Sequence, residues 1–171
     1  APGNKTSHLA STLHKSGHRF PITAFERDPT RAILLGNRLV QTGASRESES
    51  LGSVTVKNCD FLSIDPIGDS RWRNVRAVLV DPSCSGSALG HRLDQAKDAE
   101  DSNQNTSSRV DRIQALARFQ QRILSHALKF PRIERVVNST CSIHKEENEE
   151  VVAAVLPFVQ KRGMSLVRCL P

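Results

Sequence analysis

Two short runs of apolar residues stand out from the mixed hydrophobic and polar pattern of the chain. Residues 78–80 read Val-Leu-Val, and residues 135–138 read Arg-Val-Val-Asn. Runs of this length, rich in β-branched residues, are typical of parallel strands that are buried on both faces of a sheet. The first run stops at Asp81 and Pro82, because proline lacks the N–H that a strand ladder needs. The pattern therefore predicts a central parallel strand at 78–80, buried on both faces, and another short strand at 135–138.

The rest of the pattern alternates further strands with amphipathic helices. Additional strands are expected at 20–25, 54–56 and 165–170, and helices at 7–15, 29–40, 110–130 and 146–162. This alternation is typical of an α/β fold with a parallel sheet. Residues 95–108 are acidic, rich in Asn and Ser and nearly without large apolar residues, so they are expected to form a disordered insertion.

A cysteine follows each of the two apolar runs, in a turn of small hydroxyl residues. Cys84 lies in Asp-Pro-Ser-Cys-Ser-Gly, and Cys141 lies in Asn-Ser-Thr-Cys-Ser. In open α/β sheets the site lies beyond the carboxyl ends of the strands, so both thiols are expected in one crevice if the strands are neighbours. Two thiols in one crevice suggest nucleophilic chemistry. The alternative is that each cysteine is a small buried hydrophobe, but the repeated pattern favours the reactive interpretation.

Composition narrows the classes of function. A chain of 171 residues is one domain or most of one, and its net charge of +6 favours a polyanionic partner. Aromatic residues make up 4%, with no tyrosine, which leaves few platforms for stacking bases. The four cysteines lack Cys-x-x-Cys spacing, which argues against zinc, and they are too sparse for a disulfide framework, which favours a reducing intracellular compartment. No apolar run has membrane-spanning length, and no signal peptide is evident.

The chain begins with a turn of small residues, Ala1-Pro2-Gly3-Asn4-Lys5-Thr6, which leads into a helix. Backbone N–H groups at such a helix start can cradle an anion or a cofactor. A P-loop is disfavoured, because Asn4 stands where that motif needs glycine. Because the chain starts within this motif and not at a methionine, we expect it to be a fragment.

Acidic residues also follow the other predicted strands. Glu26 comes about twenty residues after the glycine turn, where an acid can hold the hydroxyl groups of a ribose; an ordinary solvated carboxylate is an equally good interpretation. Asp60 is a further acid just beyond a strand. The basic cluster 71–76 around Trp72 could contact RNA, but a solvated edge is the favoured interpretation. His144, three residues after Cys141, is more simply incidental than a catalytic base.

The motifs together resemble the Sun-type RNA (cytosine-5)-methyltransferases, which use S-adenosylmethionine. The first motif of that family, Cys-Ala-Ala-Pro-Gly-Gly-Lys-Thr, is matched by residues 1–6. The fourth is matched by residues 81–86, and the sixth by residues 139–142 together with Glu-Asn-Glu at 147–149. The resemblance covers the chain apart from 95–108.

Details within these motifs point to one branch of the family. Asn4, the Asp-Pro-Ser-Cys-Ser-Gly-Ser sequence and Phe119-Gln120-Gln121 look most like subfamily five. That subfamily is similar to the enzymes that methylate one cytosine in large-subunit ribosomal RNA. The resemblance implies a Rossmann-like class I methyltransferase sheet with helices on both faces, in a partial catalytic domain over residues 1–171. It further implies a nuclear, nucleolar protein that acts on ribosomal RNA as a monomer, with no metal and no membrane.

The resemblance also implies roles for individual residues. Cys141 would attack C6 of the cytosine, and Cys84 would assist release of the methylated RNA. Asp81 would contact the base and the cofactor, and Lys5 would help to position the base. S-adenosylmethionine would bind at the positions that match the family's cofactor residues, which are Ala1, Pro2, Gly3, Asn4, Lys5, Glu26, Arg31, Asp60 and Asp81.

The chain departs from the family pattern at three residues and at both ends. Glu26 replaces the commoner aspartate, Asn138 replaces a tyrosine, and Ala88 replaces a glycine. In the family's strand order (third, second, first, fourth, fifth), the first strand and the last strands are missing here. We therefore expect a sheet truncated at both ends and, for this chain alone, poor binding of the cofactor.

Two other classes of function compete with the methyltransferase. A non-catalytic RNA-binding or ribosome-assembly module of the same fold is favoured by the incomplete cofactor loop, whereas the intact Cys84, Cys141, Asp81 and Lys5 favour the enzyme. A cysteine hydrolase would need an oriented base and an oxyanion hole, which the sequence does not reveal.

Overall fold

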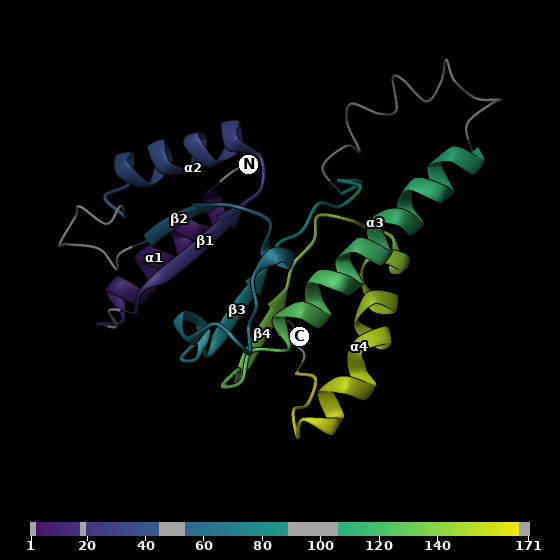
Figure 1. Ribbon diagram of the computed structural model, residues 1–171. Coiled ribbons are helices and arrows are strands. Elements are labelled where there is room, and N and C mark those ends of the chain that lie inside the picture. Colours follow the sequence, from purple (N-terminus) through teal and green to yellow (C-terminus); the bar gives the residue numbers. More distant parts are fainter. Residues whose placement is uncertain (1–2, 18–19, 45–53, 89–105, 168–171) are drawn as a thin grey trace, which may run out of the picture. The chain divides into compact units, whose positions relative to one another are not determined.

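The computed structural model describes residues 3–17, 20–44, 54–88 and 106–167 (Figure 1). The helices and strands of this part of the chain are α1 (Asn4–Lys15), β1 (Ile22–Glu26), α2 (Pro29–Gln41), β2 (Val54–Asn58), β3 (Ala77–Val80), α3 (Thr106–Ala127), β4 (Arg135–Asn138) and α4 (Glu149–Lys161). Short 3₁₀ turns are η1 (Phe61–Ser63), η2 (Ser70–Trp72) and η4 (Lys145–Glu147). The mixture of helices and short parallel strands confirms the α/β class and is consistent with a Rossmann-like methyltransferase domain.

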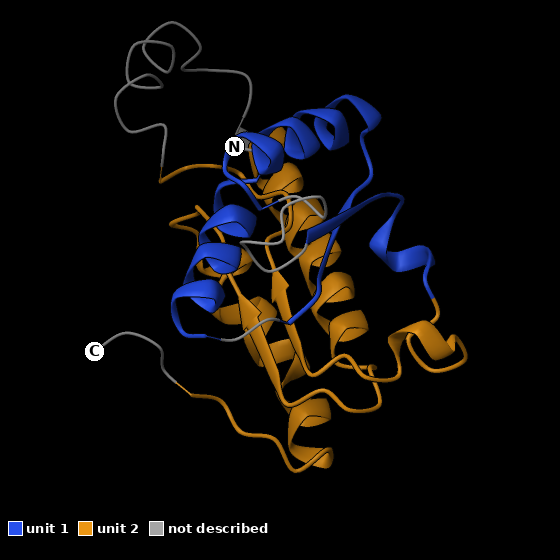
Figure 2. Cartoon of the chain, turned by 90° about the vertical axis from the view of Figure 1, so that its left-hand side faces the viewer, with its two compact units in different colours: residues 1–64 blue, residues 65–171 orange. Residues whose placement is uncertain are grey.

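The chain divides into two compact units, residues 1–64 and residues 65–171 (Figure 2). In the first unit β1 pairs with β2, and in the second unit β3 pairs with β4; both pairs are parallel. These are the neighbours that the family's strand order predicts for its second and third strands and for its fourth and fifth strands. The assignment of residues 1–171 to a single partial domain stays a prediction.

The first unit is held by a small apolar core between its helices and one face of β1 and β2. Ala10 of α1 packs with Leu35 and Leu39 of α2 and with Val54 of β2. The helix α2 begins where predicted, because the Asp28 side chain accepts a hydrogen bond from Arg31 N at 2.8 Å and Pro29 occupies the first helical position.

The apolar spacing in the sequence places Ala32, Leu34, Leu35 and Leu39 on one face of α2, and for Leu34 this expectation is wrong. The buried stripe of that helix is Ala32, Leu35 and Leu39, at the i, i+3, i+7 spacing of a single helix face. Leu34 lies off that stripe and is 52% exposed. Helix α2 therefore has one narrow buried face.

In the second unit, helices cover one face of β3 and β4, and the prediction that β3 is buried on both faces is wrong. Helix α3 packs against β3 and against α4. Val80 is buried at 3% exposure, but Leu79 and Val137, whose side chains alternate to the opposite face, are 37% and 45% exposed. Within this unit, the apolar side chains of the two strands are therefore more buried on one face of the sheet than on the other.

Several boundaries differ from those predicted. Helix α3 begins at Thr106, within the last residues of the expected insertion; residues 95–105 of that insertion lie outside the described residues. Helix α4 begins at Glu149, because Asn148, with φ −120° and ψ −89°, separates it from the preceding 3₁₀ turn. Residues 165–167 are not in a strand, and the remainder of the expected strand 165–170 lies outside the described residues.

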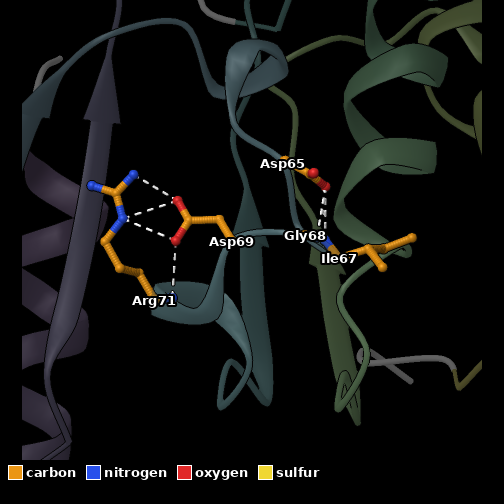
Figure 3. Close-up of polar contacts among 5 residues, drawn as sticks. All are labelled: Asp65, Ile67, Gly68, Asp69 and Arg71. Atoms are coloured by element: carbon orange, nitrogen blue, oxygen red, sulfur yellow. Dashed lines mark hydrogen bonds and ion pairs between the residues drawn. The ribbon is translucent and has the colours of Figure 1, made fainter.

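The segment from 65 to 76 is shaped by two aspartates that accept backbone hydrogen bonds (Figure 3). Asp65 accepts from Gly68 N and Ile67 N, both at 3.0 Å, and these bonds hold the pKa of Asp65 below its usual value. Asp69 binds Arg71 through both carboxylate oxygens and also caps η2, which lowers the pKa of Asp69. The predicted basic cluster thus has a local acidic partner, and its tryptophan, Trp72, is buried.

Candidate active site

The two cysteines meet beyond the carboxyl ends of β3 and β4. Val80 lies opposite Asn138 in the parallel register, and Ser139 N donates to Val80 O at 2.9 Å. The chain then turns on both strands, and the Sγ atoms of Cys84 and Cys141 come within 3.0 Å of each other. Both side chains are half-buried. This contact agrees with the expected convergence of the two strand ends, while the catalytic role of each cysteine stays a prediction.

The backbone of Cys141 is tied to the loop that carries Cys84. Its N–H points at the Cys84 sulfur at 3.4 Å, and its carbonyl accepts a hydrogen bond from Ala88 N at 3.0 Å. Ala88, one of the departures from the family pattern, therefore contributes to this contact through its backbone N–H and not through its side chain. These contacts hold the two turns side by side.

Asn148 fixes the shape of the turn around Cys141. Its Nδ2 donates to the carbonyl oxygens of Ser142 and His144, both at 2.9 Å, and its Oδ1 accepts from the Thr140 hydroxyl. One side chain thus binds the turn both before and after the cysteine. Asn148 lies in the Glu-Asn-Glu sequence that matches the family's sixth motif, although the sequence alone indicated no role for its side chain.

Glu147 is fully buried beneath the two cysteine turns. Its Oε1 accepts from Ser85 N at 2.9 Å and from Gln120 Nε2 at 2.8 Å, and its Oε2 accepts from the Ser142 hydroxyl at 2.7 Å. Gln120 comes from α3 and Glu147 from η4, and these two elements pack together. A buried carboxylate is costly unless its oxygens are bonded, and here each oxygen is.

The pKa of Glu147 reflects two opposing effects. Burial raises the pKa, but the hydrogen bonds from Ser85, Ser142 and Gln120 together outweigh it and leave the pKa below the usual 4.5. The side chain is therefore a carboxylate at neutral pH. The residue pattern gives no sign of this burial, because acids at a helix start are common and need no buried partner.

This environment predicts a pH dependence of stability. Because the pKa of Glu147 is lower in the folded protein, its charge stabilises the fold fully above pH 4.5, and this stabilisation is lost as the pH falls through the folded pKa. The free energy of unfolding then falls by no more than about 1.4 kcal/mol per pH unit. Glu147→Gln should flatten this part of the acid limb, whereas Glu150→Gln, at an exposed acid, should not. Urea unfolding between pH 6 and pH 3 measures the difference. Equal acid limbs for wild type and Glu147→Gln would contradict the assignment.

His144 does not form a pair with Cys141. In the described part of the chain its hydrogen bonds run through its backbone: its N–H donates to Ser142 Oγ, and its carbonyl accepts from Glu147 N and Asn148 Nδ2. These contacts favour the interpretation that His144 is incidental. The alternative of a cysteine hydrolase is therefore left without the base that His144 would have provided.

The acids that the resemblance assigns to the cofactor lie at one edge of the first unit. Glu26 ends β1 opposite Asn58 of β2, and Asn58 Nδ2 donates to Glu26 O at 2.9 Å, which ties the two strand ends together. The Glu26 carboxylate accepts from Asp28 N at 3.0 Å and lies 3.2 Å from Arg31 Nε. Asp60 follows β2 and caps η1 by accepting from Leu62 N at 2.8 Å.

The other described residues that are predicted to bind the cofactor lie at the start of α1 and just after β3. Gly3 caps α1 with a positive φ of 94°, and a Cβ there would approach Leu35 Cδ1 to 2.9 Å, so both the backbone conformation and the packing favour glycine. Asn4 and Lys5 form the exposed first turn of α1, and Asp81 is exposed directly after β3. Ala1 and Pro2 lie outside the described residues. The structure thus brings together the cysteines in one unit and Glu26 with Arg31 in the other.

The described residues contain neither a cluster of side chains arranged for a metal ion nor a helix suited to cross a membrane. No group of three or more His, Cys, Asp or Glu side chains is arranged to hold a metal ion. None of the described helices is both long and apolar enough to cross a membrane.

Comparison with known proteins supplies the family. The chain is 42% identical over its full length to the 25S rRNA (cytosine-C(5))-methyltransferase NSUN5 of Arabidopsis thaliana, of which it covers 28%. It is 39% identical over 96% of its length to the 28S rRNA (cytosine-C(5))-methyltransferase of Mus musculus, of which it covers 35%. It is 44% identical over 91% of its length to the 25S rRNA (cytosine-C(5))-methyltransferase rcm1 of Schizosaccharomyces pombe, of which it covers 31%.

The chain therefore spans about a third of the length of these curated relatives. Residues 1–167 match the family described as 16S rRNA methyltransferase RsmB/F, which is nearly the whole of the sequence. The chain belongs to the RsmB/F family of ribosomal RNA methyltransferases.

Proposed function

We propose that the chain forms part of an RNA (cytosine-5)-methyltransferase that acts on large-subunit ribosomal RNA. The observation that carries the proposal is the 3.0 Å contact between the Cys84 and Cys141 sulfur atoms beyond two parallel strands. The names of the three relatives support the substrate, since each is a methyltransferase of a 25S or 28S rRNA cytosine at C5. The net charge of +6 suits an RNA partner.

Cytosine C5 is a poor nucleophile, and a thiolate overcomes this by covalent catalysis. Cys141 adds to C6, and the electron pair of the C5–C6 bond becomes available at C5, where the new carbon–carbon bond would form as the bond between the methyl group and the sulfur of its donor breaks. A base then removes the C5 proton, the double bond is restored, and the C6–S bond breaks to release Cys141. Cys84, 3.0 Å away, assists this release. The target base must be unstacked or single-stranded to reach such a site.

The proposed cofactor is S-adenosylmethionine, which supplies a methyl group from its sulfonium when it is bound. The described residues fit a nucleoside: Glu26 ends β1, and Asp60 lies just beyond the neighbouring parallel strand β2. Carboxylates there can accept hydrogen bonds from ribose and adenine. Arg31 holds the Glu26 carboxylate. We assign Gly3, Asn4, Lys5 and Asp81 to the same cofactor set, together with Ala1 and Pro2 outside the described residues.

The proposal extends to the setting of the protein. Because the proposed substrate is large-subunit ribosomal RNA, we propose that the protein acts in the nucleolus, within the nucleus. We also propose that it acts as a monomer without a metal ion. Fluorescence imaging of the tagged full-length protein tests the location. Exclusion from the nucleolus would contradict this part of the proposal.

The direct test of function is methyl transfer to unmodified RNA. The full-length protein is incubated with labelled S-adenosylmethionine and transcripts of large-subunit ribosomal RNA, and the nucleosides are analysed by mass spectrometry. We expect labelled 5-methylcytidine at a single position. Label in another nucleoside, or none with correctly folded protein and RNA, would refute the proposal.

Glu26→Ala should weaken the binding of S-adenosylmethionine. Loss of a charge-assisted hydrogen bond to a ribose hydroxyl costs about 1.5–3 kcal/mol, which is roughly a tenfold to 150-fold rise in Kd. The matched control is Asp28→Asn, which removes a neighbouring charge but keeps a good helix cap for α2. Calorimetric titration measures both variants. Unchanged affinity in Glu26→Ala would show that Glu26 is only a solvated strand end.

A further inference from the structure

The buried carboxylate of Glu147 is bonded to the sequence neighbours of both cysteines. Ser85 directly follows Cys84 and donates its backbone N–H at 2.9 Å. Ser142 directly follows Cys141 and donates its hydroxyl at 2.7 Å. These two serines are 57 positions apart in the sequence, and their own hydroxyl oxygens lie 3.1 Å apart. A single side chain thus joins the two turns at equivalent positions.

Gln120 completes this arrangement from the side of α3. Its Nε2 donates both to Glu147 Oε1 at 2.8 Å and to the carbonyl of Ser83 at 3.0 Å. Ser83 directly precedes Cys84, so Gln120 and Glu147 together hold the residues on either side of that cysteine. Rotating the amide by 180° would place its oxygen against a carboxylate and a carbonyl, so the donating orientation is fixed.

The amide makes these two bonds at the expense of its own oxygen. Gln120 is fully buried, and its Oε1 has no hydrogen-bond partner among the described residues. Buried polar groups without partners are rare because they destabilise a fold. A side chain that only filled space would be better replaced by an apolar one, as buried charges also often are. The pair is therefore better explained by the geometry that it imposes on the turns.

We propose that Glu147 and Gln120 are positioning residues that keep the sulfur atoms of Cys84 and Cys141 in contact. The inference rests on the proposed function only in assigning a reaction to those sulfur atoms. Neither residue touches the RNA base in this role; both act through the turns. The property that this role depends on is the length of the Glu147 side chain, which lets its carboxylate extend from η4 to Ser85 N and Ser142 Oγ.

Two substitutions at Glu147 separate the effect of side-chain length from the effect of its negative charge. Glu147→Gln keeps the length of the side chain and an oxygen for Ser85 N and Gln120, and its amide can donate to the Ser142 hydroxyl. Glu147→Asp keeps the charge but withdraws it by one methylene group. A positioning role predicts that the glutamine variant resembles the wild type and that the aspartate variant does not. A role for charge predicts the reverse.

The readout is formation of a disulfide between Cys84 and Cys141 with diamide, a diazene oxidant. The two thiols lose two hydrogens as the S–S bond forms, and the N=N bond of the reagent takes them up to become a hydrazine. Peptide mass spectrometry of the full-length protein gives the rate for this pair. Alkylation of Cys59, in the first unit, serves as an internal control, and Glu150→Gln serves as the control variant at an exposed acid.

We expect Glu147→Asp and Gln120→Ala to form the disulfide at least about tenfold more slowly than the wild type, because small displacements of reacting groups have large effects on rate. Glu147→Gln should stay within about threefold of the wild type. Wild-type rates in Glu147→Asp and Gln120→Ala would overturn the inference, as would a slow Glu147→Gln beside a normal Glu147→Asp. Circular dichroism of each variant shows that it is folded before oxidation.

The oxidation needs neither RNA nor cofactor, so it separates this inference from the proposed function. If the variants behave as expected but the wild type transfers no methyl group, the proposed function fails and the positioning role stands. If methyl transfer is present, Glu147→Asp should lower kcat and leave the Kd of S-adenosylmethionine unchanged. Weaker cofactor binding with unchanged kcat would contradict a role that acts through the cysteine turns.

Discussion

Replacing Cys141 with alanine is expected to lower methyl transfer by at least about 10⁴-fold, the loss typical of removing a covalent nucleophile. Without the thiolate, C5 of the cytosine does not become electron-rich, and no neighbouring group replaces the missing bond. Cys84, although only 3.0 Å away, lies in a different turn and is assigned to release of the product. The Cys84→Ala variant should therefore still attack the RNA through Cys141 but release the methylated RNA slowly.

The measurement is single-turnover methyl transfer followed by multiple turnover. Cys84→Ala should form the methylated adduct and then stall, whereas Cys141→Ala should show neither phase. Cys59→Ala, at a half-buried cysteine of the first unit, is the matched control and should behave as the wild type. A Cys141→Ala variant that turns over, beside an inactive Cys84→Ala variant, would exchange the two roles.

Phe130→Ala is expected to destabilise the protein by about 3–5 kcal/mol, the usual cost of removing a large buried ring. Phe130 is 2% exposed and lies just after α3, and its carbonyl accepts a hydrogen bond from Arg162 Nη2 at 3.1 Å. The ring is among the largest fully buried side chains of the described residues. Because a typical domain is stable by only about 5–15 kcal/mol, this one change removes a large share.

Phe158→Ala provides the control for this prediction. Phe158 lies on α4 but is 42% exposed, so its loss should cost about 1 kcal/mol or less. Urea denaturation followed by circular dichroism compares the two variants. Equal losses of stability would contradict the core described for the second unit.

The sequence predicts most of the elements because their signals are local. Asp28 and Pro29 mark the start of α2, and the apolar spacing along 110–130 marks α3, although that helix begins earlier, at Thr106. The burial of β3 is not a local property. Leu79 has the sequence of a doubly buried strand, but its exposure depends on which elements lie on each face of the sheet.

The site shows the same division between local and long-range information. The convergence of the two cysteines follows from the rule that parallel strands end at one edge, which the sequence can supply. Glu147 and Gln120 are 27 positions apart, and their contact depends on how α3 packs against η4. The one available signal was the resemblance itself, since both residues lie in stretches that match the family's motifs. Pattern alone reads them as a helix start and a helix position.

The most direct test of the account is to identify the cysteine that bonds to RNA. The full-length protein is incubated with S-adenosylmethionine and ribosomal RNA that carries 5-azacytosine, in which a nitrogen at position 5 prevents release of the adduct. The covalent complex is digested with nuclease and protease, and mass spectrometry locates the nucleotide. We predict that the nucleotide is attached to the sulfur of Cys141. Attachment to Cys84, or RNA that remains unattached to a folded protein with bound cofactor, would contradict the account.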